Sequence, residues 1–93
     1  MKIGDIAKRE LRDATERYLD IRPELGDQFK NAMKVAFREI ASYPDRHPLI
    51  LGTARQYLVV GFPYSVIYRY RTGTIRIIAV HHHSRNPLGW RHR

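Results

Sequence analysis

The sequence is defined first by what it does not contain. It has no cysteine, which excludes disulfide bonds and thiolate chemistry and is typical of a reducing compartment. No apolar run approaches the roughly 18 residues that a membrane span requires, and the N-terminal segment MKIGDIAKRELRD lacks the apolar core of a signal peptide. We therefore expect a cytoplasmic protein without a membrane partner, whose 93 residues form one domain over residues 1–93.

Acidic residues are also missing from the whole second half of the chain. Residues 1–45 hold nine Lys and Arg against nine Asp and Glu, whereas residues 46–93 hold eight arginines, no lysine, no acid and all five histidines. The formal net charge of +8 therefore lies entirely after Asp45. A one-sided positive field predicts an anionic partner, either nucleic acid or an acidic protein segment.

Two helices are predicted in the neutral half. Apolar side chains recur at helical spacing over residues 5–22 (Ala7, Leu11, Ala14, Tyr18 and Ile21) and over residues 24–43 (Leu25, Phe29, Met33, Phe37 and Ile40). Pro23 separates the two stretches, because proline disfavours helical geometry at Arg22 and suits the first turn of a following helix. The short link predicts an antiparallel helical hairpin, with the aromatic and Met side chains in the core.

Strands are predicted in the basic half. Residues 55–62, 64–71 and 74–82 are rich in β-branched and aromatic side chains and are separated by Pro63 and by Thr72–Gly73, and a basic tail follows over residues 84–93. Helices followed by strands indicate an α+β fold. We expect the helical hairpin to pack on one face of a three- or four-stranded, mainly antiparallel sheet.

The free face of this sheet is predicted to carry arginine. A two-residue turn at Thr72–Gly73 determines which residues of the two strands lie opposite each other. On one face the predicted pairs are apolar: Tyr70 with Ile75, Tyr68 with Ile77, and Val66 with Ala79. On the second face they are Arg71 with Thr74, Arg69 with Arg76, and Ile67 with Ile78. A tight reversal at Pro63 adds two residues, so the basic face comprises Arg55, Tyr57, Arg69, Arg71 and Arg76. Opposed arginines destabilise a sheet unless an anion lies between them, which again indicates an anionic partner. The alternative is a solvated face that arginine keeps soluble.

These residues resemble a known family. Two helices, then FPYSVIYR, a short turn, IRIIAVHHHSRNP and a closing tryptophan are similar in order and spacing to the RelE/ParE superfamily of bacterial toxins from type II toxin–antitoxin pairs. The resemblance extends from AKREL at residues 7–11 to Trp90. It implies a cytoplasmic toxin that arrests growth and is neutralised by a cognate antitoxin. The family's first strand looks shortened or absent here, because only MKIGDI precedes Ala7, which would leave a sheet edge unpaired.

The resemblance implies one of two mechanisms. RelE-like members cleave messenger RNA on the ribosome, and ParE-like members inhibit DNA gyrase; the ending HxxRxPxxW favours the ParE-like branch, in which the chain is no enzyme. RNA cleavage would need an acid or base and phosphate-binding cations, and its candidates are Arg55, Tyr57, Arg69, His82 and Arg85. By strand parity His82 shares the basic face with Arg76. A third reading is a stand-alone basic module that binds nucleic acid.

The tail and the histidine run complete the expected site. Besides the basic face, we expect His82, Arg85, Trp90 and Arg91 to contact the target or the antitoxin, and truncation after Pro87 to abolish toxicity without unfolding the domain. A simple docking of Trp90 on the domain is the alternative. His81 and His83 raise zinc as a possibility, but only His47 and His92 remain as further ligands in that half. We expect neither a metal nor a cofactor.

Overall fold

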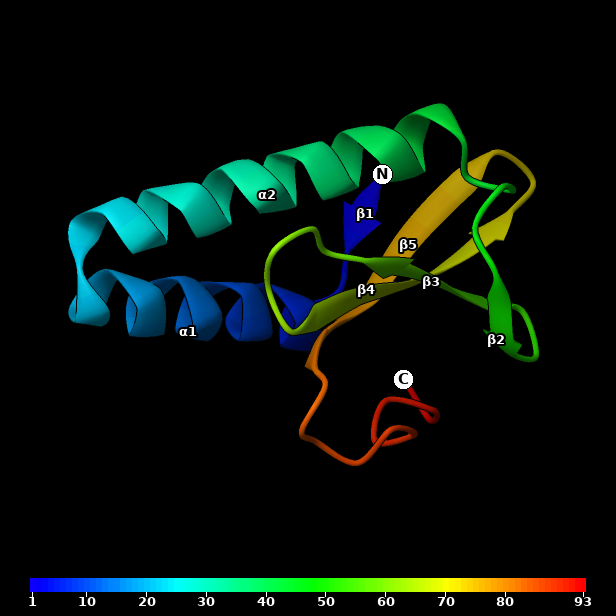
Figure 1. Ribbon diagram of the computed structural model, residues 1–93. Helices are drawn as coiled ribbons and strands as arrows, with labels where there is room; N and C mark the ends of the chain where they lie inside the picture. Colours follow the sequence, from blue (N-terminus) through cyan, green and yellow to red (C-terminus); the bar gives the residue numbers. More distant parts are fainter.

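The structure is a computed structural model that describes residues 1–93. Two helices pack on one face of a five-stranded sheet (Figure 1). The elements in chain order are β1 (Lys2–Ile3), α1 (Asp5–Ile21), α2 (Pro23–Ser42), β2 (Leu49–Leu51), β3 (Ala54–Leu58), β4 (Tyr64–Arg71) and β5 (Thr74–His82). The sheet order is β1-β5-β4-β3-β2. The α+β fold with a helical hairpin is therefore confirmed, but the sheet has five strands rather than three or four.

A single residue joins the two helices. Arg22 is extended (φ −168°, ψ 150°), as expected before Pro23, and Pro23 is the first residue of α2. The helices lie side by side and antiparallel (Figure 1). They approach closely at Gly26, where an added Cβ would overlap the Leu19 side chain. Neither helix is long and apolar enough to cross a membrane.

Both edge strands of the sheet are short. β1 is two residues long and runs parallel to β5, with Lys2 beside Arg76 and Ile3 beside Ile77. The first strand is thus shortened but present. β2, at the other edge, is three residues long and pairs irregularly with β3. The strand predicted over residues 55–62 is shorter than expected, because β3 ends at Leu58.

The register of β4 and β5 follows the prediction only near their turn. Thr72 and Gly73 both have positive φ, as a two-residue hairpin turn requires, and the four pairs from Arg71–Thr74 to Tyr68–Ile77 form as expected. Between Ile67 and Tyr68 the register then shifts, so that Ile67 lies opposite Ala79 and Ser65 lies opposite His81. The predicted Ile67–Ile78 and Val66–Ala79 pairs are wrong, because one extra residue in β5 exchanges its two faces beyond this bulge.

The pairing of β3 with β4 also differs from the prediction. Arg55 lies opposite Tyr68 and Tyr57 lies opposite Val66, instead of opposite Arg71 and Arg69. The chain does not reverse tightly at Pro63: Val59 N–H donates to Tyr64 O at 2.9 Å, which closes a loop that contains Gly61 with φ +82°. This longer loop changes the register by an odd number of residues, which moves Arg55 and Tyr57 to the helix side of the sheet.

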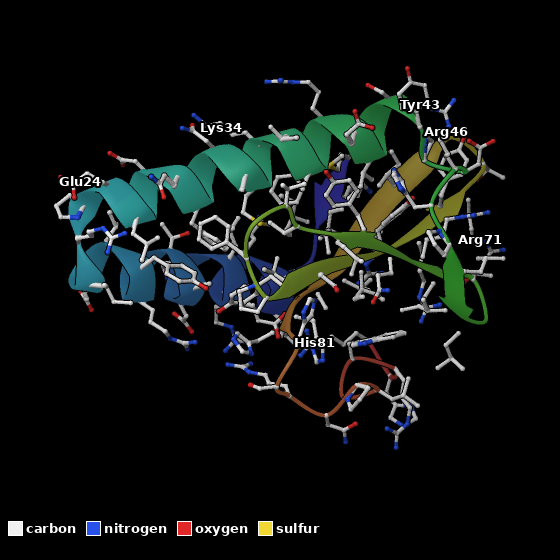
Figure 2. All side chains as sticks on the ribbon, viewed as in Figure 1. Glu24, Lys34, Tyr43, Arg46, Arg71 and His81 are labelled. Carbon is white, nitrogen blue, oxygen red and sulfur yellow. The ribbon has the colours of Figure 1, made fainter.

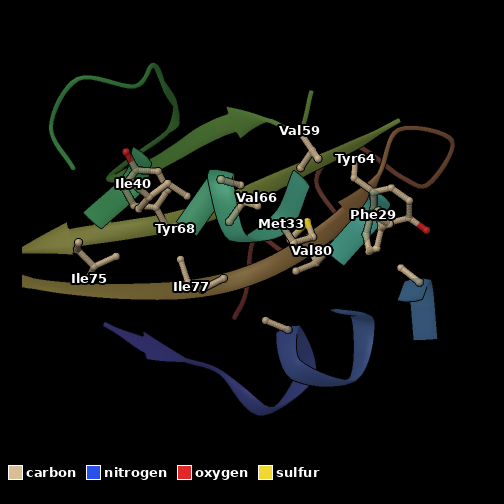
Figure 3. Packing of buried hydrophobic residues seen from close by; sticks show 13 residues of the cluster. Phe29, Met33, Ile40, Val59, Tyr64, Val66, Tyr68, Ile75, Ile77 and Val80 are labelled. Carbon is tan, nitrogen blue, oxygen red and sulfur yellow. The ribbon is translucent and has the colours of Figure 1, made fainter. Parts of the chain in front are cut away.

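Two hydrophobic clusters lie on opposite faces of the sheet. The larger cluster holds 13 buried residues between the helices and the sheet, and Figure 3 shows Phe29 and Met33 of α2 packed near Val66 and Val80. The smaller cluster is on the outer face and consists of Ala54, Ile67, Ile78, Ala79 and Trp90. The C-terminal segment, coloured orange to red in Figure 1, supplies Trp90 and covers part of this face.

The close helix contact predicts the effect of Gly26→Ala. Alanine normally stabilises a helix interior by about 0.5–1 kcal/mol relative to glycine, but here its Cβ would overlap Leu19 and lie 3.0 Å from the Leu19 Cα. We expect Gly26→Ala to lower the free energy of unfolding by about 1 kcal/mol through overpacking. Thermal unfolding followed by circular dichroism measures it, with exposed Asn31→Ala as the control that should be neutral or stabilising. A Gly26→Ala protein as stable as the wild type would show that the interface between the helices accommodates the added methyl group.

Candidate functional site

Four cations form a row across the outer face of the sheet. Lys2, Arg76 and Arg69 are register neighbours on β1, β5 and β4, and Arg71 follows Arg69 two residues along β4 on the same face. We call Lys2, Arg69, Arg71 and Arg76 the basic row. Neighbouring strands are about 4.8 Å apart, so the bases of these side chains are close together.

No carboxylate compensates the basic row. The ion pairs of the structure join Arg12 to Asp13 and join Arg85 and Arg93 to Glu10, and none involves a member of the row. The one side-chain hydrogen bond within reach runs from Arg69 Nη1 to Thr53 Oγ1 at 2.9 Å. Arg69 and Arg76 are directly opposed, and like charges in that position repel. The row can therefore bind an anionic surface with little loss of internal bonding.

Arg55 and Tyr57 lie elsewhere, and their assignment to the basic face was wrong. Arg55 Nη1 donates to the carbonyl oxygens of Asp45 (3.1 Å) and His47 (2.7 Å), so this arginine holds the segment between α2 and β2. The Tyr57 ring packs edge-on against His47, with 5.2 Å between the ring centroids. Both residues therefore stabilise the segment between α2 and β2.

His82 is also on the helix side, because the bulge reverses the parity of β5. It lies opposite Tyr64, with the two rings 4.9 Å apart and nearly perpendicular. Its Nδ1 accepts a hydrogen bond from the Ser84 N–H at 3.0 Å. Burial, followed by the charge of Arg17, lowers the pKa of His82. The histidine that faces outward beside Ser65 is His81.

Glu10, which the sequence did not single out, holds the C-terminal tail on the sheet. Its side chain is 9% exposed, and Arg93 binds it with both guanidinium nitrogens: Nη1 to Oε1 at 2.7 Å and Nη2 to Oε2 at 3.2 Å. Glu10 Oε1 also accepts the Val80 N–H at 3.1 Å, and Arg85 Nη1 lies 3.8 Å from Oε2. One carboxylate of α1 thus connects to β5 and to the C-terminal tail. The only hint in the sequence was its place in AKREL.

The same contacts close the sheet edge that was expected to be open. β1 ends at Ile3, beside Ile77, so β5 continues beyond its short neighbour. There the Ile78 carbonyl accepts Arg93 Nη1 at 3.2 Å, and the Val80 N–H is bonded by Glu10. These backbone groups are satisfied by side chains, without a partner strand.

Trp90 is a core residue. It is 1% exposed and packs on Ile67, Ile78 and Ala79. The docking alternative is therefore correct, and Trp90 is not presented to a partner. Truncation after Pro87 would remove Trp90 and Arg93 together, so the shortened domain would lose a core side chain and the ion pair with Glu10. Arg91 stays exposed, with its Nη1 bonded to the Leu88 carbonyl at 3.1 Å.

A small cleft separates the tail from the sheet. It has a volume of about 290 Å³ and is lined by five polar side chains and four apolar ones: Gln56, Ser65, His81, His83 and Arg85, with Leu58, Ile67, Pro87 and Trp90. We call it the tail cleft. Figure 2 shows its His81 where β5 meets the tail, with Arg71 of the basic row at the far end of the sheet.

His81 is the buried titratable group of the tail cleft. The Ser65 Oγ and His83 Nε2 atoms lie 2.9 Å apart, within hydrogen-bond distance. Burial lowers the pKa of His81, an effect that the charge of Glu10 opposes. No three His, Asp or Glu side chains of the chain are grouped so that they could hold a metal ion.

This fold and this charged face define a small α+β protein with an uncompensated positive surface. The family described as "ParE toxin of type II toxin-antitoxin system, parDE" matches residues 2–87, and the chain belongs to that family. Among solved structures, one described as "Chromosomal ParDE TA system from P. aeruginosa" is similar to this fold. The TM-score is 0.64 at 14% sequence identity, over 87% of this chain and 91% of that one. Comparison with curated proteins gives no match.

The bonds of Glu10 predict a large effect of Glu10→Gln. The amide keeps the shape of the side chain but loses its charge, and it leaves Arg93 without its partner. We expect the free energy of unfolding to fall by about 2–3 kcal/mol, because charge-assisted and partly buried bonds are lost together. Denaturant unfolding followed by Trp90 fluorescence and by circular dichroism measures it. Glu16→Gln, at an exposed position of the same helix, is the control and should change stability by less than about 0.5 kcal/mol. Equal stability of the two variants would contradict a structural role for Glu10.

Proposed function

We propose that this chain is the toxin of a ParE-type pair, that it arrests growth by inhibiting DNA gyrase, and that a cognate antitoxin neutralises it in the cytoplasm. The membership in the ParE toxin family supports the toxin role. The observation that carries the binding mode is the basic row, four cations on one sheet face with no carboxylate among their ion-pair partners. Such a face favours rapid association with an anionic surface.

In this proposal the antitoxin supplies the missing negative charge. An acidic segment laid across the outer face would place carboxylates between Arg69 and Arg76, and it would relieve their repulsion. The toxin's target would then compete for the same cations when the antitoxin is lost. Arg85 and Arg91, which are exposed in the tail, add further positive charge to the surface of the molecule.

Messenger RNA cleavage is the alternative, and the geometry gives it less support. Its candidate residues do not gather on one surface: Arg69 lies on the outer face, whereas Arg55 and His82 lie on the helix side. A stand-alone nucleic-acid-binding module would need the same basic row, but family membership favours a toxin that has an antitoxin.

The test is induction of the chain in cells with and without its neighbouring antitoxin gene, followed by two assays with purified protein. We expect growth arrest without the antitoxin, inhibition of gyrase supercoiling in vitro, and no ribosome-dependent cleavage of messenger RNA. Cleavage with unaffected supercoiling would replace the gyrase proposal with the RNA-cleavage alternative.

The role of the basic row is tested by the double variant Arg69→Gln/Arg76→Gln. We expect its affinity for the antitoxin to fall at least about tenfold at low salt, and the difference to shrink at high salt. Its thermal stability should be equal or slightly higher, because a like-charge contact is removed. The matched control, Arg12→Gln/Arg38→Gln, removes the same charge from exposed positions on the helices. Equal loss of affinity in both double variants would mean that net charge, and not the row, drives binding.

A further inference from the structure

The polar side chains of the tail cleft have no role in the proposed inhibition of gyrase. Four of its polar side chains, Ser65, His81, His83 and Arg85, can each donate a hydrogen bond, and no carboxylate lines it. Arg85 adds a permanent positive charge. The polar groups of the cleft come from neighbouring strands and from the start of the tail, so they converge from different directions.

One ring nitrogen of His81 is buried without a partner. His81 is 8% exposed, and its Nε2 atom has no hydrogen-bond partner in the protein. Buried polar atoms are almost always bonded, and an exception calls for an explanation such as a ligand. The neighbouring Ser65 hydroxyl and His83 ring are within 2.9 Å of each other, which keeps a donor and an acceptor together at the same wall.

Arg85 is placed to complete the set. Its side chain is 54% exposed, and its contact with Glu10 is loose, at 3.8 Å, whereas Arg93 holds the same carboxylate at 2.7 Å. Since Arg93 already satisfies Glu10, the Arg85 guanidinium can turn to an anion in the cleft with little loss. The two arginines beside Glu10 thus differ: Arg93 is structural, and Arg85 is available to a ligand.

We propose that the tail cleft binds the phosphate of a nucleotide, held by Ser65, His81, His83 and Arg85. Ser65 and His83 share one hydrogen bond with each other, and the donors that remain with His81 and Arg85 suit the several oxygens of a phosphate better than the two of a carboxylate. The volume of about 290 Å³ is at the small end of ligand pockets, so it takes one phosphate with its sugar. Gln56 and the apolar Leu58 and Pro87 at the wall offer an amide and a nonpolar surface to the sugar or base.

The site is distinct from the basic row, and its ligand has two possible sources, a free nucleotide or a single strand of nucleic acid. Both present the same phosphate and sugar. The proposal goes beyond gyrase inhibition and can fail or hold independently of it, because it is tested by binding alone.

The experiment titrates the ¹⁵N-labelled full chain with inorganic phosphate, acetate, a nucleoside 5′-monophosphate and an eight-nucleotide single strand, while NMR follows the histidine rings and the Trp90 indole. We expect saturable shifts at His81 and His83 with the monophosphate, at least about tenfold tighter than with acetate. A single strand that binds more tightly than the monophosphate identifies nucleic acid as the source, and equal affinity identifies the free nucleotide.

Variants locate the binding. Arg85→Gln and His83→Asn should each weaken the monophosphate about tenfold, the equivalent of ~1.4 kcal/mol, whereas Arg12→Gln removes the same charge as Arg85→Gln from α1 and should have less than about a twofold effect. Both cleft variants change exposed side chains, so the ¹⁵N spectrum should remain that of the folded chain. The proposal is overturned if neither nucleotide probe saturates, if acetate binds as well as the monophosphate, or if Arg12→Gln weakens binding as much as Arg85→Gln. It is also overturned if the single strand responds only to Arg69→Gln/Arg76→Gln, since the basic row would then be the site.

Discussion

The carboxylate of Glu10 is the contact on which the second half of the molecule depends. It extends from α1 to the Val80 N–H of β5 and receives both guanidinium nitrogens of Arg93. β1 ends before this point of β5, so the backbone groups on that edge have no strand partner, and Glu10 and Arg93 bond them. With Arg93 held, the tail is fixed at its last residue, and Trp90 completes the core on the outer face of the sheet. The tail cleft exists because the tail is held there.

Glu10 also separates two groups of cations. It pairs closely with Arg93 and only loosely with Arg85. Lys2, Arg69, Arg71 and Arg76 have no carboxylate within ion-pair distance. The fold thus uses the Glu10 carboxylate for structure, and the basic row remains without an internal counter-ion. This division explains how a chain with a net charge of +8 can fold stably and still present a strongly anion-seeking face.

The sequence predicted the features that neighbouring residues determine, and it failed for features without a signal in the nearby sequence. The helices follow from periodicity and from Pro23, and the register near Thr72–Gly73 follows from the turn. The bulge at Ile78 has no local sequence signal, and it alone moved His82 to the helix side and His81 to the outer face. In the same way, a longer loop at residues 59–63 moved Arg55 and Tyr57. Each error was one of strand parity, where a shift of a single residue exchanges the faces.

The contact between Glu10 and Arg93 could not be predicted from the sequence, for a different reason. The two residues are 83 positions apart, and the sequence shows a balanced first half and a second half without acids, which conceals an ion pair between them. Trp90 was ambiguous because a tryptophan after Pro87 and Gly89 can equally dock or protrude. Only the position of the tail on the sheet decides between these possibilities.

Amide hydrogen exchange at Val80 in the full chain tests most directly whether Glu10 holds the edge of β5 and the tail. If Glu10 bonds this N–H inside the structure, Val80 should exchange as slowly as the amides of the central strands, such as those of Val66 and Ile77, although no strand pairs with that edge of β5. Exchange at Val80 as fast as at the exposed turn residues Thr72 and Gly73 would show that the carboxylate does not hold the edge, and the account of the tail would fail with it.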